Sequence, residues 1–324
     1  MTSESFRPFM KDIIDYAGLF PPAKLGMSSA VNEYLRCRSD KHSWMLGRFV
    51  CPVHGLKELE ASCREFSDNS PIQISAITSP IKTDMDFQDS LFCELETIKE
   101  FIENSNGKAT VDIIEIKLSG KLLNSDNSIV FRQMLEDADH LIGYSGIKRV
   151  TLFFEILFSA DCHNHAKKII QECSVFNRKS SGAKRVGVKI RCGGAHPSFV
   201  PKSADVAFAI SESRDAKIPF KATAGLHHPI RHLNSQTKVA SHGFMNLFAA
   251  GILAWVHGLS DAKIVSILED QCSENFVFSS ETFRWKKLKA STKEIASARE
   301  ALMTSYGSCS FKEPVDDLTR LGLL

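Results

Sequence analysis

The feature that most constrains the fold is an alternation of β-rich apolar runs with helical patterns between residues 44 and 285. Such alternation is typical of parallel βα units. An eighth candidate strand, over 12–20, precedes these runs and ends at Pro21-Pro22, where a strand has to stop. Eight strands predict a closed barrel. The other seven predicted strands are 44–53, 71–78, 110–118, 149–157, 185–192, 218–226 and 276–280.

Apolar spacing between these strands predicts the covering helices. They are expected at 55–66, 87–104, 127–141, 161–174, 202–215, 238–256 and 260–271. We therefore expect an α/β protein, a (β/α)8 TIM barrel in a single domain with a short C-terminal extension. The barrel would span 1–289, and a helix and tail over 290–324 would pack on it. A doubly wound open sheet is the alternative, although no GxGxxG motif follows the first strand.

Composition and charge exclude several classes of protein. The 324 residues are 43% hydrophobic and 24% charged, enough for a large core, and a net charge of +2 gives no field for holding nucleic acid. The apolar stretch 244–256 is too short to cross a bilayer, and the first residues lack a signal-peptide pattern. Nine cysteines without a CxxC pair favour free thiols. We expect a cytoplasmic protein without nucleic-acid or membrane partners, and leave homo-oligomer formation open.

Charged residues interrupt strands that should be almost wholly apolar, because both faces of a parallel barrel strand are covered. We expect this charged face to line the barrel interior near its open carboxyl end, where the groups can be solvated and paired. An internal ion-pair network, in which two glutamates neutralise two lysines, is the alternative. Because side chains alternate along a strand, Glu115 shares a face with Lys117, Lys189 with Arg191, and Lys221 with Thr223. Glu155 lies on the predicted strand 149–157, between the strands of Glu115 and Lys189.

Two lysines on successive predicted strands suggest Schiff-base chemistry, in which one cation lowers the pKa of a neighbouring lysine. Around them, Val188-Lys189-Ile190 and Phe220-Lys221 resemble motifs of the deoxyribose-phosphate aldolase family, a class I aldolase family with a TIM-barrel fold. The resemblance implies that Lys189 is the nucleophile and Lys221 its perturbing neighbour.

Two weaker motifs extend this resemblance. Asp112, in Val111-Asp112-Ile113-Ile114, is similar to the family's proton-transferring aspartate, and Ser279-Ser280 to its phosphate site. In a straight strand Asp112 would face away from Glu115, so only a bulge lets both line the interior. After Lys189 the family's threonine and serine run is replaced by Ile190-Arg191-Cys192-Gly193-Gly194, which implies that the site is altered.

A histidine-rich loop follows the Lys221 strand. His227, His228 and Arg231 would act in acid–base chemistry or bind an anion. Gly225, like Gly193 and Gly194, lets backbone approach a carboxylate or phosphate. A metal at His227 and His228 is the alternative, but adjacent residues on an extended segment point opposite ways, and we predict no metal.

These features together predict an enzyme without a cofactor, an aldolase-type lyase or related Schiff-base enzyme acting on a small anionic carbonyl compound. The alternative is a non-covalent barrel for a sugar phosphate or similar anion, an isomerase or metal-assisted hydrolase using Glu115, Glu155 and the His227–His228 loop. The catalytic candidates are Lys189, Lys221, Asp112, Glu115 and Glu155. The substrate-binding candidates are Arg48, Lys117, Arg191, Gly193, Gly194, Thr223, Gly225, His227, His228, Arg231, Ser279 and Ser280.

Overall fold

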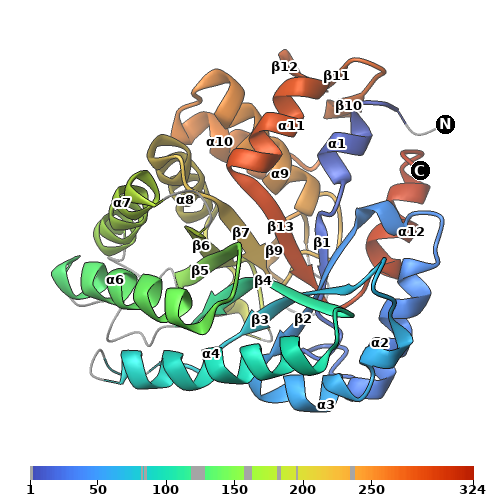
Figure 1. The fold of residues 1–324 in the computed structure, drawn as a ribbon. Helices are drawn as coiled ribbons and strands as arrows, with labels where there is room; N and C mark the ends of the chain where they lie inside the picture. Colours follow the sequence, from blue (N-terminus) through green and yellow to red (C-terminus); the bar gives the residue numbers. More distant parts are fainter. Residues whose placement is uncertain are drawn as a thin grey trace. The chain divides into compact units, whose positions relative to one another are not determined.

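The structure, a computed structural model, describes residues 3–81, 83, 86–117, 128–156, 163–180, 184–194, 196–233 and 238–324. Eight strands form a closed barrel (Figure 1). Their order around the barrel is β1 (Ile14–Tyr16), β13 (Met303–Ser308), β7 (Phe220–Thr223), β6 (Lys184–Arg191), β5 (Val150–Ile156), β4 (Ala109–Ile116), β3 (Ile72–Ile77) and β2 (Leu46–Pro52). The predicted α/β barrel is confirmed.

The chain clusters into two compact units. The first comprises residues 1–16, 37–47 and 190–324, and the second comprises 17–36 and 48–189. The described helices are α1 (Phe6–Met10), α2 (Met27–Arg38), α3 (Leu56–Glu60), α4 (Phe87–Asn104), α6 (Ser128–Ser145), α7 (His163–Lys179), α8 (Ser203–Ala216), α9 (Phe244–His257), α10 (Asp261–Leu268), α11 (Thr292–Ala301) and α12 (Lys312–Arg320).

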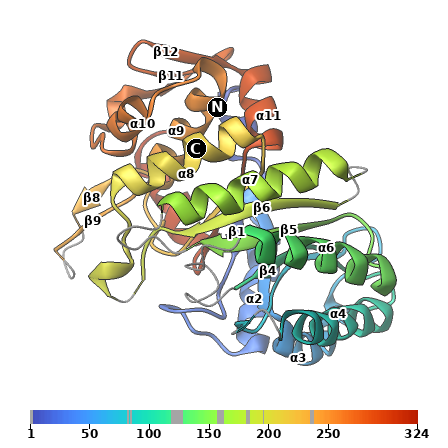
Figure 2. The ribbon, with the colours of Figure 1, turned by 90° about the vertical axis from the view of Figure 1, so that its left-hand side faces the viewer.

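In the second unit, parallel strands β2 to β5 are held in register and covered by long helices. Helix α4 buries Leu91, Leu95 and Ile98, whose spacing puts them on one face. Helices α4 and α6 lie side by side, as Figure 2 shows. The barrel strands of this unit nevertheless carry buried polar side chains, among them Ser75 on β3, Glu115 on β4 and Glu155 on β5.

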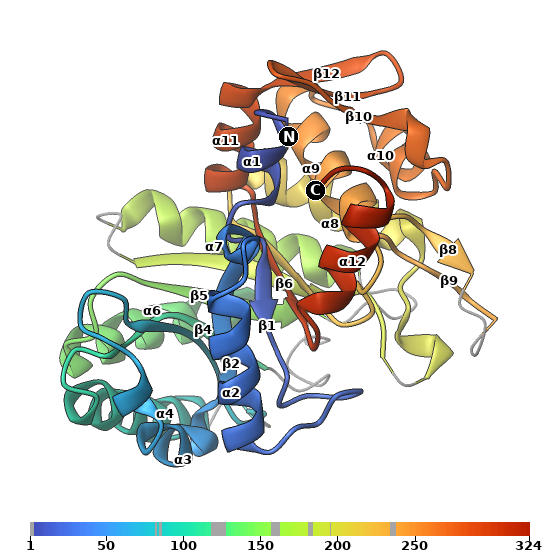
Figure 3. The same cartoon turned by 90° about the vertical axis from the view of Figure 1, so that its right-hand side faces the viewer.

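In the first unit, β13 pairs in parallel with β1 on one side and β7 on the other. Helix α9 is buried along Phe244–Ala254, as its uniformly apolar sequence requires, and contacts α8, α10 and α11 (Figure 3). Within the described part of the chain, no helix is long and apolar enough to cross a membrane.

The prediction of the last barrel strand was wrong. Residues 276–278 form β10 (Phe276–Phe278), which joins β11 (Thr282–Trp285) and β12 (Leu288–Ser291) in a separate antiparallel sheet. The barrel strand is instead β13, inside the segment 290–324 that we expected to be an extension. The barrel therefore continues beyond residue 289. Strand β13 was not predicted because its sequence, Met-Thr-Ser-Tyr-Gly-Ser, lacks a continuous apolar run.

Candidate functional site

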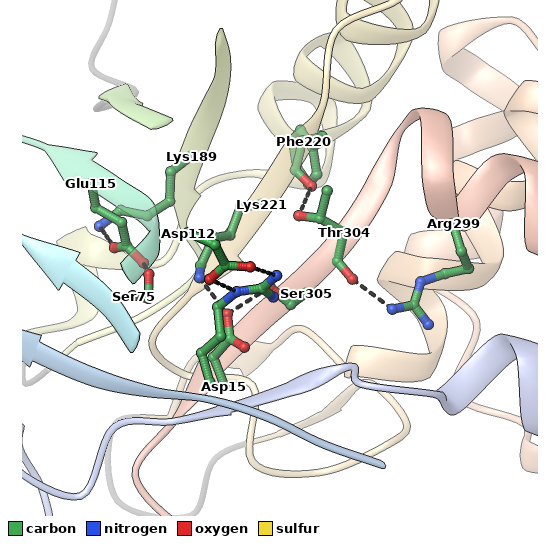
Figure 4. Close-up of polar contacts among 11 residues, drawn as sticks. Asp15, Ser75, Asp112, Glu115, Lys189, Phe220, Lys221, Arg299, Thr304 and Ser305 are labelled. Atoms are coloured by element: carbon green, nitrogen blue, oxygen red, sulfur yellow. Dashed lines mark hydrogen bonds and ion pairs between the residues drawn. The ribbon is translucent and has the colours of Figure 1, made fainter. Parts of the chain in front are cut away.

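A buried lysine lies between two glutamates in the second unit. Lys189 Nζ is 2.6 Å from Glu115 Oε2 and 2.6 Å from Glu155 Oε2, and all three residues are buried. Ser75 Oγ donates to Glu115 Oε1 at 2.7 Å, as Figure 4 shows for the Ser75, Glu115 and Lys189 side chains. Three predicted catalytic residues are thus brought together, and they form the pairing expected of an internal ion-pair network.

The strand register brings these groups to one end of the sheet. Ile77 pairs with Glu115, and Glu115 pairs with Phe153, two residues before Glu155. Glu115 and Glu155 each precede the last residue of their strands, and Lys189 stands two residues before the end of β6. The cluster therefore lies toward the carboxyl ends of β4 to β6, where barrel enzymes hold their chemistry.

The charge state of Lys189 follows from its neighbours. Burial alone would lower the pKa of the Lys189 ammonium, but attraction and hydrogen bonds from Glu115 and Glu155 outweigh burial and raise it. Lys189 is therefore an ammonium group at neutral pH. A Schiff-base lysine must be a neutral amine, so this environment is the opposite of the one that such a nucleophile requires.

Two buried oxygen atoms at this end of the sheet have no partner among the described residues. Within the described residues, Glu155 Oε1 and Thr78 Oγ1 make no hydrogen bond. Thr78 directly follows β3 and is 3% exposed, and Glu155 is 5% exposed. A buried polar group without a partner is costly, and each such group calls for an explanation. Among the described residues, the network therefore leaves Glu155 Oε1 unpaired, and the Thr78 hydroxyl is unpaired on the residue whose amide donates to the Glu115 carbonyl.

The second predicted lysine has a different partner. In the first unit, Lys221 Nζ forms an ion pair with Asp15 Oδ2, which also accepts a 2.6 Å hydrogen bond from Ser305 Oγ. Lys221, Asp15 and Ser305 are at most 1% exposed and are drawn together in Figure 4. Glu115 and Glu155 bind Lys189, so the expectation that they neutralise both lysines was half right.

Asp112 stands at a β-bulge. The β3–β4 register shifts so that Ile74 pairs with Val111 and Ser75 with Ile113, which leaves Asp112 out of step. Its carboxylate accepts two hydrogen bonds from Arg48, Nε to Oδ1 at 2.8 Å and Nη2 to Oδ2 at 2.6 Å. Two candidate site residues therefore bind each other. Lys117 follows β4 and is partly exposed.

The glycines after β6 and β7 press their backbones together. A Cβ atom on Gly193 would lie 2.7 Å from the Gly225 Cα, and Gly225 has a left-handed φ of 73°. The Cys192 amide donates to the Thr223 carbonyl at 2.8 Å, which fixes the start of this contact. Close packing of the two loops therefore accounts for both glycines.

Gly193→Ala is expected to lower the free energy of unfolding by about 1–3 kcal/mol, because the new methyl group meets backbone that cannot rotate away. Gly26→Ala is the matched control, since a Cβ at Gly26 meets nothing within 4 Å. Urea denaturation of both variants measures the difference. Equal stability of Gly193→Ala and the wild type would refute the close approach.

The predicted histidine loop is engaged by the C-terminal helix. His227 Nδ1 lies 3.0 Å from Glu313 Oε2, and His228 Nδ1 lies 2.6 Å from Asp317 Oδ2; both carboxylates belong to α12. Arg231 Nη1 is 3.3 Å from His242 Nδ1. In the part of the chain that the structure describes, no group of three His, Cys, Asp or Glu residues is arranged to hold a metal ion.

His242 is buried in the neutral form. Its Nε2–H donates to the Pro201 carbonyl at 2.9 Å, and its Nδ1 accepts from Arg231. Burial, assisted by the Arg231 charge, lowers the pKa of His242, while the Pro201 carbonyl and Glu269 oppose that shift. Below pH about 6.5 the unfolded chain therefore takes up a proton that the folded chain resists.

The contribution of neutral His242 to the free energy of unfolding is expected to be fully present above pH about 6.5 and to decline as the pH falls below that value. In His242→Gln the loss of unfolding free energy between pH 7 and pH 5 should be smaller than in the wild type. His54→Gln, at an exposed position, should keep the full decline. An unchanged decline in His242→Gln would contradict the buried neutral ring.

Two further candidates lie elsewhere than expected. Ser279 and Ser280 stand between β10 and β11, where Ser279 Oγ donates to the Thr282 carbonyl and the Ser279 amide donates to Ser5 Oγ. Ser279 therefore stabilises a hairpin outside the barrel sheet, and the expected position of both serines at the end of the last barrel strand was wrong.

Sequence reasoning missed several members of these clusters. Ser75, Thr78 and Ser305 were absent from the candidates, and Asp15 was assigned no role, although each contributes a buried polar group to a barrel strand or its end. The available signal was a small polar residue within, or directly after, an apolar strand. That pattern is too common to single out a site.

Comparisons with known proteins leave the family open. A scan against models of protein families finds no match, and a search of curated proteins finds no relative. Among solved structures, the crystal structure of D-psicose 3-epimerase in the presence of D-fructose aligns with a TM-score of 0.46 and 10% identity. The alignment covers 89% of this chain and 96% of that chain. This similarity is too low for a conclusion about this chain, and its own residues must define its function.

Proposed function

We propose that this chain is an enzyme that moves a proton on a small hydroxy-carbonyl compound, with Glu155 as the acid–base residue. One observation carries the proposal: Glu155 is buried with Oε2 bound to Lys189 and Oε1 without a partner among the described residues. Active sites are where such open, oriented carboxylates are retained despite their cost.

The proposed step balances without an oxidant or a cofactor. Glu155 Oε1 takes a proton from the carbon next to the substrate carbonyl, and the electron pair passes to the carbonyl oxygen. The same carboxyl then returns a proton to a neighbouring atom, so the product is an isomer of the substrate. Lys189 holds Oε2 and fixes the carboxylate in one orientation, while its charge keeps the cluster from carrying two unopposed negative charges.

The two open atoms also suggest the substrate class. Glu155 Oε1 needs a donor and Thr78 Oγ1 needs a partner, and both are buried. A ligand with a hydroxyl group beside a carbonyl supplies a donor and an acceptor on adjacent carbons. The proposal therefore matches the non-covalent alternative that the sequence left open.

The aldolase interpretation requires a different charge state. A class I aldolase needs a neutral lysine, whereas the carboxylates on both sides of Lys189 raise its pKa. An imine at Lys189 would also need the two Lys189 ion pairs to break before attack. These features favour proton transfer over Schiff-base formation at this residue.

Solvent exchange tests the proposal. The protein is incubated in D2O with a panel of small hydroxy-aldehydes and hydroxy-ketones, and loss of the proton next to the carbonyl is followed by NMR. We expect the wild type to exchange at least one compound and Glu155→Gln to be slower by about 10²–10⁴-fold, the usual contribution of a general base.

Glu172→Gln is the matched control, because Glu172 pairs with Arg132 between α7 and α6, away from the candidate cluster. It should keep the wild-type exchange rate. Thr78→Val, which removes the open hydroxyl and retains the shape, should slow exchange less than Glu155→Gln does. A wild-type rate in Glu155→Gln would overturn the assignment.

A further inference from the structure

The arginine at the end of β6 has a guanidinium group without a polar partner in the part of the chain that the structure describes. Within the described residues, Arg191 makes no side-chain hydrogen bond and no ion pair, and its Nε is buried with no partner. Its guanidinium carbon lies 5.6 Å from the centre of the Phe199 ring. The group is therefore held in place by a ring face, while its N–H donors remain open.

Three other arginines of this chain have polar partners. Arg48 binds Asp112 through two nitrogens, Arg132 binds Glu172 in the same way, and Arg299 donates to backbone carbonyls. A cation partly withdrawn from water without a counter-charge is unfavourable. Among the described residues, Arg191 thus differs from these three arginines, whose guanidinium groups have polar partners.

Close contacts position the Phe199 ring beside Arg191. A Cβ on Gly194 would lie 2.8 Å from Phe199 Cδ2, so only glycine lets the ring approach this loop so closely. His196 is edge-on to Phe199, with ring centres 6.3 Å apart, and its Nδ1 lies 2.8 Å from Ser198 Oγ. These contacts fix the ring on which the guanidinium rests.

We propose that Arg191 binds an oxyanion, the carboxylate or phosphate group of a ligand, through its Nε–H edge. A guanidinium stacked on a ring keeps its N–H donors in its own plane, where two oxygens of a carboxylate or phosphate fit side by side. The site is formed by Arg191, Gly194 and Phe199 of the first unit and does not depend on the proton-transfer chemistry proposed for Glu155.

Thermal unfolding at constant ionic strength tests this site without any turnover. Inorganic phosphate and malonate are titrated separately, with sodium chloride adjusted to balance. A ligand that binds only the folded protein raises the midpoint with increasing concentration. We expect a saturable rise with at least one of the two anions. A rise with phosphate alone assigns the site to phosphate, and a rise with malonate alone assigns it to carboxylates.

Variants locate the binding at this residue. Arg191→Gln should weaken binding at least ten-fold, and Arg191→Lys should weaken it less, because an ammonium keeps the charge but loses the fork. Arg64→Gln removes an exposed charge elsewhere and should bind like the wild type. Full binding by Arg191→Gln, or no rise with either anion, would overturn the proposal.

A second measurement avoids any dependence on variant folding. In wild-type protein labelled with ¹⁵N-arginine, the Arg191 Nε–H signal should shift saturably with the same anion, and Arg191→Lys identifies the signal. An Arg191 signal that stays in place while the midpoint rises would show that the anion binds elsewhere.

Discussion

Lys189→Met is expected to lower the free energy of unfolding by about 3–5 kcal/mol at pH 7, the usual cost of removing one partner from a buried ion pair. The substitution leaves Glu115 and Glu155 buried without the ammonium that lies 2.6 Å from an oxygen of each. Urea denaturation measures the loss. Lys57→Met, at an exposed position on α3, is the control and should change stability by less than about 0.5 kcal/mol.

The loss should also depend on pH. Without Lys189, the two buried carboxylates repel each other, so we expect their pKa values in the folded variant to rise above the unfolded values. Groups with a raised folded-state pKa are favourable at low pH and become unfavourable as the pH rises. The deficit of Lys189→Met should therefore shrink from pH 7 toward pH 4, and a deficit that is constant with pH would contradict this account.

Lys221→Met is expected to lower the free energy of unfolding by a similar amount, about 3–5 kcal/mol, because it leaves the fully buried Asp15 carboxylate without its ion-pair partner. Asp15→Asn, combined with Lys221→Met, removes the buried negative charge, so the double variant should recover part of the lost free energy of unfolding. The coupling free energy from the double-mutant cycle should be about 1–3 kcal/mol. Additive losses would mean that Lys221 and Asp15 do not stabilise each other.

The barrel could be predicted because parallel strands need cover on both faces. That requirement produces runs such as Ile72–Ile77 and Val150–Ile156, separated by amphipathic helices, and both appear plainly in the sequence. The last strand could not be predicted, since four of the six residues of β13 are Thr, Ser or Gly and the strand depends on its parallel pairing with β1 and β7. Phe276–Phe278 has a higher β propensity than β13, but it belongs to the separate antiparallel sheet, where Phe278 contacts Phe9.

The candidate site was predictable only where charge interrupted an apolar strand. Glu115, Glu155 and Lys189 were found for that reason, but the sequence did not show that both glutamates bind the same lysine, because alternation fixes a face and not a partner. Asp112 illustrates the limit, since its assignment rested on a resemblance while alternation placed it on the face opposite Glu115, and the structure has a bulge at that position. The α12 carboxylates that bind His227 and His228 lie far along the chain, and no local pattern connects them.

The most direct test of the central claim is the titration of the Lys189 side chain itself. In protein labelled with ¹⁵N-lysine, the Nζ signal that disappears in Lys189→Met is followed from pH 6 upward. The account predicts an ammonium group that persists above pH 10.5, the ordinary pKa of lysine, because Glu115 and Glu155 together raise the Lys189 pKa. Deprotonation near neutral pH would instead give the neutral amine of a Schiff-base enzyme and contradict the assignment of Glu155 as the acid–base residue.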